Sequence, residues 1–346
     1  MTRTNDSVRM LFFATWMAGS ALIAQNAAPE INFDSVANPL QLPPGLYLGE
    51  VGGVASDSRG DLFVYTRTGH PTISIGTSRP FAHGGSRLFE FDRNGKFIRE
   101  IGKDSYGFMV ASQVRVDRDD NIWVVDEMTS MVMKFDPHGR VAMLLGRKAE
   151  NVSVPARPAR GGDGAGQPAD LFDRPTDVAW DPAGNIFVAD GLGNCRVAKF
   201  DKNGKFVTSW GKRGKAEGEF ANVRSVAVDA DGNVYVADGG NRRVQVFDND
   251  GNFKTAFNNI GNAQALCMTN RPDQVLYVSN SNPPDDIDQD GEIYKMSLDG
   301  TILGKFGRAG KLLKEFGTVN AIDCRGRNML YVGEIGDLRV QKLLLH

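Results

Sequence analysis

Residues 174–210 read RPTDVAWDPAGNIFVADGLGNCRVAKFDKNGKFVTSW, and residues 223–257 read VRSVAVDADGNVYVADGGNRRVQVFDNDGNFKTAF. The second stretch repeats the first, since Asp190 and Asp238, each at the end of an apolar run, stand 48 residues apart. Self-similarity at a period of about 40–50 residues is typical of a repeat architecture, in which each copy forms one structural unit. The repeat therefore predicts a fold built from several similar structural units.

Each copy contains four short segments with strand character. Asn185–Asp190 and Asn233–Asp238 are rich in β-branched and aromatic residues, and each follows an Asp-x-x-Gly sequence typical of a type I turn closed by a left-handed glycine. Such a turn joins two antiparallel strands. A third strand ending in Phe-Asp and a second glycine turn follow in both copies. Four antiparallel strands per copy are what one blade of a β-propeller requires.

Weaker copies begin near Val51 and Val114 and recur around Leu276 and Met329, which gives six blades in all. The last copy lacks a fourth strand, and we expect Ile31–Val36 to supply it. A strand taken from the other end of the chain would close the ring and cover a sheet edge. The sequence thus predicts an all-β fold, a six-bladed β-propeller of four-stranded antiparallel blades whose ring is closed by an N-terminal strand.

The first 24 residues have the pattern of an export signal. Arg3 and Arg9 precede an apolar run, Met10 to Ala24, which is too short for a convincing membrane span. We expect a signal peptide over residues 1–24, a single propeller domain over residues 25–346, and a secreted or periplasmic location without a membrane span after signal removal. The alternative is an N-terminal anchor that is not cleaved.

The net charge and the cysteine content argue against a nucleic-acid-binding protein and against a disulfide scaffold. The formal net charge of −2 offers no electrostatic footprint for nucleic acid, so no such partner is expected. The three cysteines, Cys195, Cys267 and Cys324, are too few for a disulfide scaffold, and their odd number leaves at least one unpaired. Each lies in or beside a predicted strand, and we expect buried thiols.

Two acid and arginine pairs recur at the same place in both clear copies, Asp190 with Arg196 and Asp238 with Arg243. Repetition in successive blades favours a structural ion pair between strands over a catalytic role.

The blades resemble NHL repeats, and the stretch from Leu42 to His70, LPPGLYLGEVGGVASDSRGDLFVYTRTGH, resembles the opening of the peptidyl-α-hydroxyglycine α-amidating lyases. Arg174–Val178 and Ala189–Gly191 match that family in the same order. The resemblance implies a propeller with a catalytic zinc in its central cavity, held by three histidines.

The residues that the family uses for chemistry are replaced in this chain. The resemblance places Ser112, Arg224 and Asn320 where the zinc-binding histidines stand, Leu192 in place of a catalytic tyrosine, and Ala321 in place of a carboxylate that serves a structural calcium. A zinc site needs three or four His, Cys or carboxylate ligands that converge on one point. Zinc is therefore not expected.

The same register predicts a group of polar side chains at the mouth of the central cavity. They are Arg67, His70, Ser112, Thr176, Arg224, Gln264 and Asn320. Two arginines among neutral hydrogen-bonding groups suit a carboxylate or another oxyanion. The alternative is that Arg224 pairs with a neighbouring acid such as Glu334.

A possible calcium loop lies in the fifth copy. Asp286, Asp288 and Asp290 stand at its first, third and fifth positions, followed by Gly291 and then Glu292, which we include among the candidate ligands. The twelfth position holds serine instead of a bidentate acid, so any calcium binding is expected to be weak. The alternative is a solvated acidic turn.

Three functions fit this pattern. The first is an exported binding protein that holds a small anionic ligand or a peptide carboxylate at the axis without zinc chemistry. The second is a lyase-like enzyme with a different metal arrangement or with altered chemistry that uses Arg67, His70 and Arg224. The third is a scaffold that contacts another exported protein through its loops.

Overall fold

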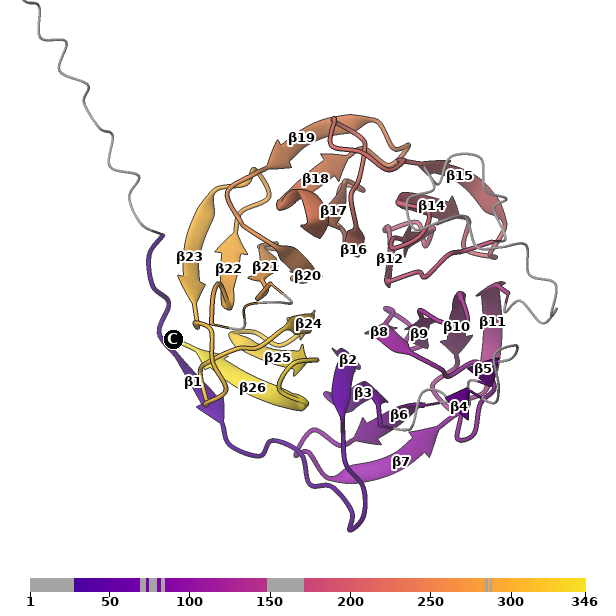
Figure 1. Ribbon diagram of the computed structural model, residues 1–346, viewed down its shortest axis with the longest axis vertical. Coiled ribbons are helices and arrows are strands. Elements are labelled where there is room, and N and C mark those ends of the chain that lie inside the picture. Colours follow the sequence, from indigo (N-terminus) through magenta and orange to yellow (C-terminus); the bar gives the residue numbers. More distant parts are fainter. Residues whose placement is uncertain are drawn as a thin grey trace, which may run out of the picture.

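The computed structural model describes residues 28–68, 73–74, 80–81, 85–147, 171–283, 286 and 288–346. Six four-stranded antiparallel sheets stand like blades around one axis (Figure 1). This confirms the predicted six-bladed propeller. The first blade contains β2 (Glu50–Ser56), β3 (Leu62–Arg67), β6 (Ser86–Phe91) and β7 (Phe97–Ile101). The second contains β8 (Ala111–Val116), β9 (Ile122–Asp126), β10 (Met131–Phe135) and β11 (Val141–Gly146).

The remaining blades follow the same order from the axis outward. The third contains β12 (Asp177–Trp180), β13 (Ile186–Asp190), β14 (Arg196–Phe200) and β15 (Phe206–Trp210). The fourth contains β16 (Val223–Val228), β17 (Val234–Asp238), β18 (Arg243–Phe247) and β19 (Phe253–Phe257), with a short 3-10 helix, η1 (Gly239–Asn241). The fifth contains β20 (Ala263–Met268), β21 (Leu276–Asn280), β22 (Glu292–Met296) and β23 (Ile302–Phe306). The sixth contains β24 (Val319–Asp323), β25 (Met329–Glu334), β26 (Arg339–Leu345) and β1 (Phe33–Val36).

The turns between the first two strands of a blade form as their sequence dictates. The Asp181 carboxylate accepts a hydrogen bond from the backbone N–H of Asn185 at 2.8 Å, and Gly184 adopts a φ of +88°. Asp229 and Gly232 repeat this arrangement in the next blade. A residue with a side chain would be strained at that φ, so glycine closes both turns.

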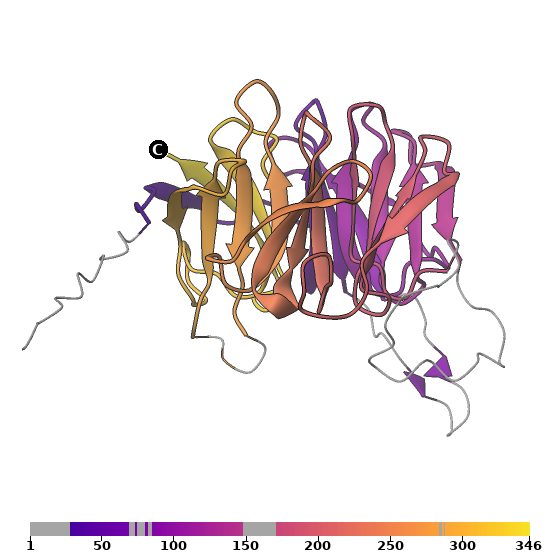
Figure 2. The same ribbon diagram turned by 90° about the horizontal axis from the view of Figure 1, so that it is seen from above.

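The two ends of the ring differ. We call the end where the inner strands begin the insertion face, and a small ribbon, β4 (Ile73–Ser74) with β5 (Pro80–Phe81), projects from it (Figure 2). We call the opposite end the turn face, because there the inner strands run into the turns that begin at Asp57, Asp117, Asp181 and Asp229.

The core lies between the blades rather than inside a single sheet. Between the third and fourth blades, for example, Phe187, Phe220 and Phe247 are buried, and the ring of Trp210 lies 5.8 Å from that of Phe247. Each sheet buries both of its faces against its neighbours, so its central strands read as nearly continuous apolar runs.

The N-terminal strand closes the ring as predicted. β1 pairs with β26 in antiparallel register, Phe33 opposite Leu345, and occupies the outer position of the sixth blade. The ring of Phe33 also lies 5.2 Å from that of Phe306 in the fifth blade.

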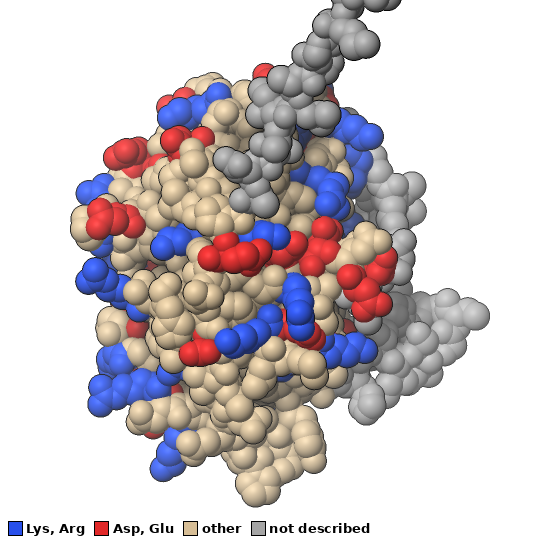
Figure 3. Space-filling view, turned by 90° about the vertical axis from the view of Figure 1, so that its left-hand side faces the viewer, with Lys and Arg blue, Asp and Glu red and all other residues tan. Residues whose placement is uncertain are grey.

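On the side of the propeller that carries β1 and β23, acidic and basic side chains are intermixed (Figure 3). Two ion pairs on this side, Lys314 with Asp34 and Lys305 with Glu30, tie the N-terminal segment to the fifth blade and its exit loop.

The recurring acid and arginine pairs are structural, as predicted. The Nε of Arg196 lies 2.9 Å from Asp190, and that of Arg243 lies 2.9 Å from Asp238. Burial raises the pKa of Asp190 despite this neighbouring cation. The sixth blade has the same pair with a glutamate, since Arg339 binds the fully buried Glu334.

The expectation of buried thiols is wrong for two of the three cysteines. Cys267 and Cys324 form a disulfide between the inner-strand ends of the fifth and sixth blades, with Cα atoms 6.0 Å apart, while Cys195 is buried and free. The repeat brings equivalent strand ends side by side, and two cysteines one repeat apart therefore meet. Among the described residues, no helix is long and apolar enough to cross a membrane.

Candidate functional site

Six of the seven predicted mouth residues are described, and each stands at the insertion-face end of a different blade. In five blades the register of the inner strand shifts near its beginning, at Gly52, Ser112, Arg224, Gln264 and Asn320. A β-bulge of this kind re-aims a side chain at the rim of a sheet. In the third blade Thr176 stands just before β12.

Three of these side chains are engaged by the ring itself. Ser112 donates through its hydroxyl to the backbone oxygen of Thr176 at 3.0 Å, and the Thr176 hydroxyl donates to that of Val223 at 3.0 Å. The Asn320 amide reaches the backbone oxygens of Gly52 at 2.6 Å and Ser112 at 2.9 Å. These bonds link successive blades around the axis and give the three residues a structural role.

Arg67, at the end of β3, is held at the mouth by three groups. Its Nε donates to the backbone oxygen of Ala111 at 2.8 Å, and its Nη1 to Glu50 at 2.9 Å. The second acid, Glu127, lies 3.8 Å from Nη2. The Arg67 guanidinium is thus fixed in position and remains a quarter exposed.

Arg224 differs from Arg67 in its contacts. Within the described part of the chain it makes no hydrogen bond and no ion pair, and Glu334 pairs with Arg339 instead. Burial lowers the pKa of Arg224; the charge of Glu127 acts against this, and those of Arg174 and Arg67 add to it. A guanidinium without an ion pair, close enough to two other arginines to feel their charges, has the chemistry that suits an anion.

One residue of this mouth was not predicted from the sequence. Arg174 belongs to the group, and it is oriented by a hydrogen bond to the backbone oxygen of Leu192 at 2.8 Å and by Asp173, 3.5 Å away. Its place just before Thr176, at the entrance of an inner strand, was the available signal. Gln264, which was predicted, is nearly buried, and its amide has no hydrogen-bond partner among the described residues.

Two other predictions have different outcomes. His70 lies outside the described residues. In the predicted calcium loop, Asp290 accepts a hydrogen bond from the Asn280 amide at 3.1 Å and lies 3.5 Å from Arg242, and the same amide donates to Glu292 at 3.0 Å.

Asp286 accepts hydrogen bonds from the Asp288 N–H and the Gln289 amide. In the part of the chain that the structure describes, no group of three His, Cys, Asp or Glu side chains is placed to hold a metal ion. Calcium binding at Asp286, Asp288, Asp290 and Glu292 stays a prediction.

Below the mouth, one side chain crosses the axis. Arg115, from the second blade, binds both carboxylate oxygens of Asp177 in the third blade at 2.9 and 2.7 Å. It also donates to the backbone oxygens of Leu266 at 3.0 Å and Ile322 at 3.3 Å, in the fifth and sixth blades. Asp177 is fully buried. The guanidinium therefore occupies the centre of the ring between the two faces.

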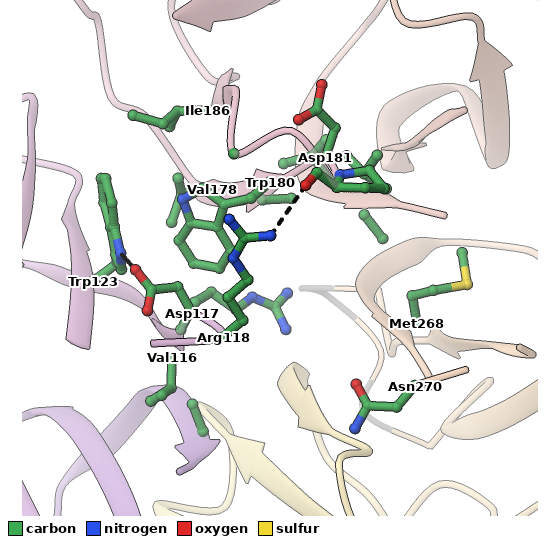
Figure 4. Close-up of a pocket in the computed structure, with 18 of the residues that line it drawn as sticks. Val116, Asp117, Arg118, Trp123, Val178, Trp180, Asp181, Ile186, Met268 and Asn270 are labelled. Atoms are coloured by element: carbon green, nitrogen blue, oxygen red, sulfur yellow. Dashed lines mark hydrogen bonds between the residues drawn. The ribbon is translucent and has the colours of Figure 1, made fainter. Parts of the chain in front are cut away.

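Beyond Arg115, a cavity of 720 Å³ opens at the turn face. Its walls include Val116, Trp180 and Met268, and Arg118 and Asn270 lie at its rim (Figure 4). This cavity was not predicted from the sequence.

Comparisons with known proteins agree with the repeat. The NHL repeat family matches residues 172–200 and 220–247. Rat peptidylglycine alpha-amidating monooxygenase is 31% identical over 226 residues, which is 60% of this chain and 22% of the rat protein. A probable peptidyl-alpha-hydroxyglycine alpha-amidating lyase of Caenorhabditis elegans is 29% identical over 59% of this chain and 57% of the worm protein. Human NHL repeat-containing protein 3 is 27% identical over 50% of this chain and 48% of the human protein.

Among solved structures, a streptogramin B lyase superimposes with a TM-score of 0.54 at 13% identity, covering 91% of this chain and 98% of that one. A catalytically inactive virginiamycin B lyase from Staphylococcus aureus with quinupristin gives a TM-score of 0.55 at 11% identity, covering 92% and 100%. At this level of identity the likeness shows the fold alone.

The fold is a six-bladed propeller in which the third and fourth blades match NHL repeats. Within that class, the chain is related in sequence to the amidating lyases and to NHL repeat-containing proteins. It covers between 22% and 28% of the length of the four amidating monooxygenases compared.

Proposed function

We propose that this propeller is an exported protein that binds a small molecule or a peptide through a carboxylate at the insertion-face mouth. One observation carries the proposal: Arg224 is a partly buried cation that forms no ion pair and no side-chain hydrogen bond with a described residue, and the charges of Arg174 and Arg67 act on it. Taking a charge out of water is costly unless a counter-charge offsets the loss. A bound carboxylate supplies that counter-charge.

The surroundings of Arg224 support a ligand of one negative charge. Arg67 already has Glu50 as a partner, and Arg174 has Asp173 nearby, whereas Arg224 has only the more distant charge of Glu127 and forms no ion pair with a described residue. Gln264, whose amide can donate and accept, is free to bind a neutral polar group of the same ligand. Export is supported by the Cys267–Cys324 disulfide, because disulfides persist mainly in oxidising compartments.

The zinc site of the lyase family does not fit these residues. Ser112 and Asn320 already donate to backbone oxygens, and a guanidinium such as that of Arg224 stays protonated and repels a metal ion. No step of the proposed function is assigned to zinc.

Isothermal titration with matched carboxylates and C-terminal peptide acids tests the proposal, with the corresponding amides as uncharged analogues. Arg224→Ala is expected to weaken the carboxylate ligand about tenfold to a hundredfold, because a hydrogen bond to a charged group contributes roughly 1.5–3 kcal/mol. Its melting temperature should stay close to that of the parent protein. The control is Arg140→Ala, which removes an arginine that is 76% exposed and paired with Asp136.

Equal affinity of Arg224→Ala and the parent protein would contradict the proposal. One zinc held tightly per chain, or turnover of α-hydroxyglycine peptides that a chelator abolishes, would instead support the lyase-like alternative.

A further inference from the structure

The cavity at the turn face is a site of its own, separate from the mouth that holds Arg224. It is lined by the last residues of the inner strands and by the turns that follow them. Its volume of 720 Å³ lies in the usual range for small-molecule sites, roughly 300–1,000 Å³. Arg115, which also lines it, occupies the axis between the two faces and is fixed there by Asp177.

Trp180 gives this cavity an aromatic wall (Figure 4). It is the last residue of β12, and the equivalent positions of the second and fourth blades hold Val116 and Val228. Its indole packs against that of Trp123, with ring centroids 5.3 Å apart. Trp123 is held in turn by a hydrogen bond that its Nε1 donates to the Asp117 carboxylate at 2.9 Å. The wall is therefore rigid.

The Trp180 indole also lacks a hydrogen-bond partner. Its Nε1 is buried, and no acceptor for it exists among the described residues. Buried indole N–H groups usually find a partner. On the far side of the cavity, Met268 contributes an apolar, polarisable thioether that packs well against aromatic rings.

Three cations in the lining, Arg118, Arg271 and Lys202, form no ion pair with a described residue. Arg118 and Arg271 each donate to a backbone oxygen, that of Pro182 at 3.1 Å and that of Ala230 at 2.5 Å, and neither forms an ion pair with a described residue. Lys202, also in the lining, makes no hydrogen bond or ion pair within the same residues.

Most carboxylates in the cavity lining already accept hydrogen bonds from the protein. Those that accept hydrogen bonds within their own turn or from a neighbouring side chain are Asp117, Asp181, Asp229 and Asp323. Asp119 is the remaining acid in the described lining, and it lies exposed at the rim. Negative charge is thus fixed in the turns, whereas the cationic heads remain available to a ligand.

We propose that this cavity is a second binding site, for a small planar aromatic molecule that carries an anionic group. The ring of the ligand packs on Trp180 and the apolar ends of the inner strands, and its anionic group binds the cations at the rim. Aromatic stacking and charge-assisted hydrogen bonds together select this class over aliphatic acids and over neutral aromatics. The site does not depend on the carboxylate site around Arg224.

Fluorescence titration with 8-anilinonaphthalene-1-sulfonate, an aromatic monoanion, tests this site. We expect one saturable site per chain in the parent protein. Trp180→Val should weaken binding about tenfold, because the stacking surface is lost. This variant places in the third blade the residue type that the second and fourth blades carry at the same position, so it is expected to fold. N-phenyl-1-naphthylamine, the uncharged analogue, should bind the parent protein about tenfold more weakly than the sulfonate.

The controls separate the two sites. Trp210→Phe alters the other tryptophan of the third blade, which does not line the cavity, and should leave the affinity for the sulfonate unchanged. Arg224→Ala should do the same. Absence of saturable binding, equal affinity of Trp180→Val and the parent protein, or a loss of binding in Arg224→Ala would each overturn the proposal. The carboxylate titration of Arg224→Ala is read independently, so either site can fail alone.

Discussion

At the residue scale, the ion pair of Arg115 and Asp177 is the interaction on which the centre of the ring depends. Arg115→Ala leaves the fully buried Asp177 without its cation, and removing one partner of a buried pair typically costs about 3–5 kcal/mol. We expect a loss of that size in the free energy of unfolding, measured by urea denaturation. The double variant Arg115→Met with Asp177→Asn should recover much of it, because no buried charge remains. A single variant as stable as the parent protein would show that the pair is not needed.

Asp323 provides a pH-dependent prediction. Burial raises its pKa, while hydrogen bonds from Ser56 and the charges of Arg325 and Arg115 act in the opposite direction without reversing the shift. The folded protein therefore binds this proton more tightly than the unfolded chain, so the contribution of Asp323 to stability grows as pH falls through its folded pKa towards about 4. Asp323→Asn should be more stable than the parent protein near pH 8, and the difference should shrink on acidification.

The control for this pH series is Asp34, whose shift has the opposite sign. Hydrogen bonds from Lys314 and His346 lower its pKa, so its contribution is present at neutral pH and is lost as pH falls below about 4. Asp34→Asn should therefore lose stability relative to the parent protein at neutral pH, and the loss should fade in acid. Melting temperatures measured from pH 8 to about pH 2 decide both cases, and a pH-independent difference for Asp323→Asn contradicts the assignment.

At the element scale, the contribution of β1 to the closed ring can be tested by removing it. A protein that begins at Pro44 lacks it, which opens the edge of β26 and removes the contacts of Phe33 with the fifth blade. We expect a lower melting temperature than for a protein that begins at Ala28 and keeps the strand. Identical melting curves for the two would mean that β1 adds nothing to the closed ring.

The connection between β21 and β22 carries the calcium prediction. Millimolar calcium should protect it from proteolysis if Asp286, Asp288 and Asp290 bind the ion, and the double variant Asp288→Ala with Asp290→Ala should lose this protection. The contacts of Asp290 with Asn280 and Arg242 must then rearrange, which adds to the expected weakness of binding. If calcium does not change the cleavage of the parent protein, the calcium prediction is wrong. The segment is then an acidic turn held by amide groups and an arginine.

At the scale of the whole molecule, the features that recur in every blade could be predicted from the sequence. Contacts between residues of different blades could not. The family resemblance placed Arg224 among the mouth residues, and the turns, the blade count and the closing strand follow from the period. The Cys267–Cys324 bridge and the convergence of Arg174 with Arg224 do not, because each joins two copies. The turn-face cavity was missed for the same reason, since Trp180 and Met268 come from blades that are distant in the chain.

The closing strand also bears on how the protein is made. Asp34 and His346, which meet in the finished sixth blade, lie 312 residues apart in sequence. At a synthesis rate of about 5–20 residues per second, β1 emerges roughly 15–60 s before β26 exists to receive it. Throughout that interval the nascent chain is an open arc with an unpaired strand at its leading end. Any product that stops short of β26 keeps that open end, and a protease should distinguish it from the closed ring.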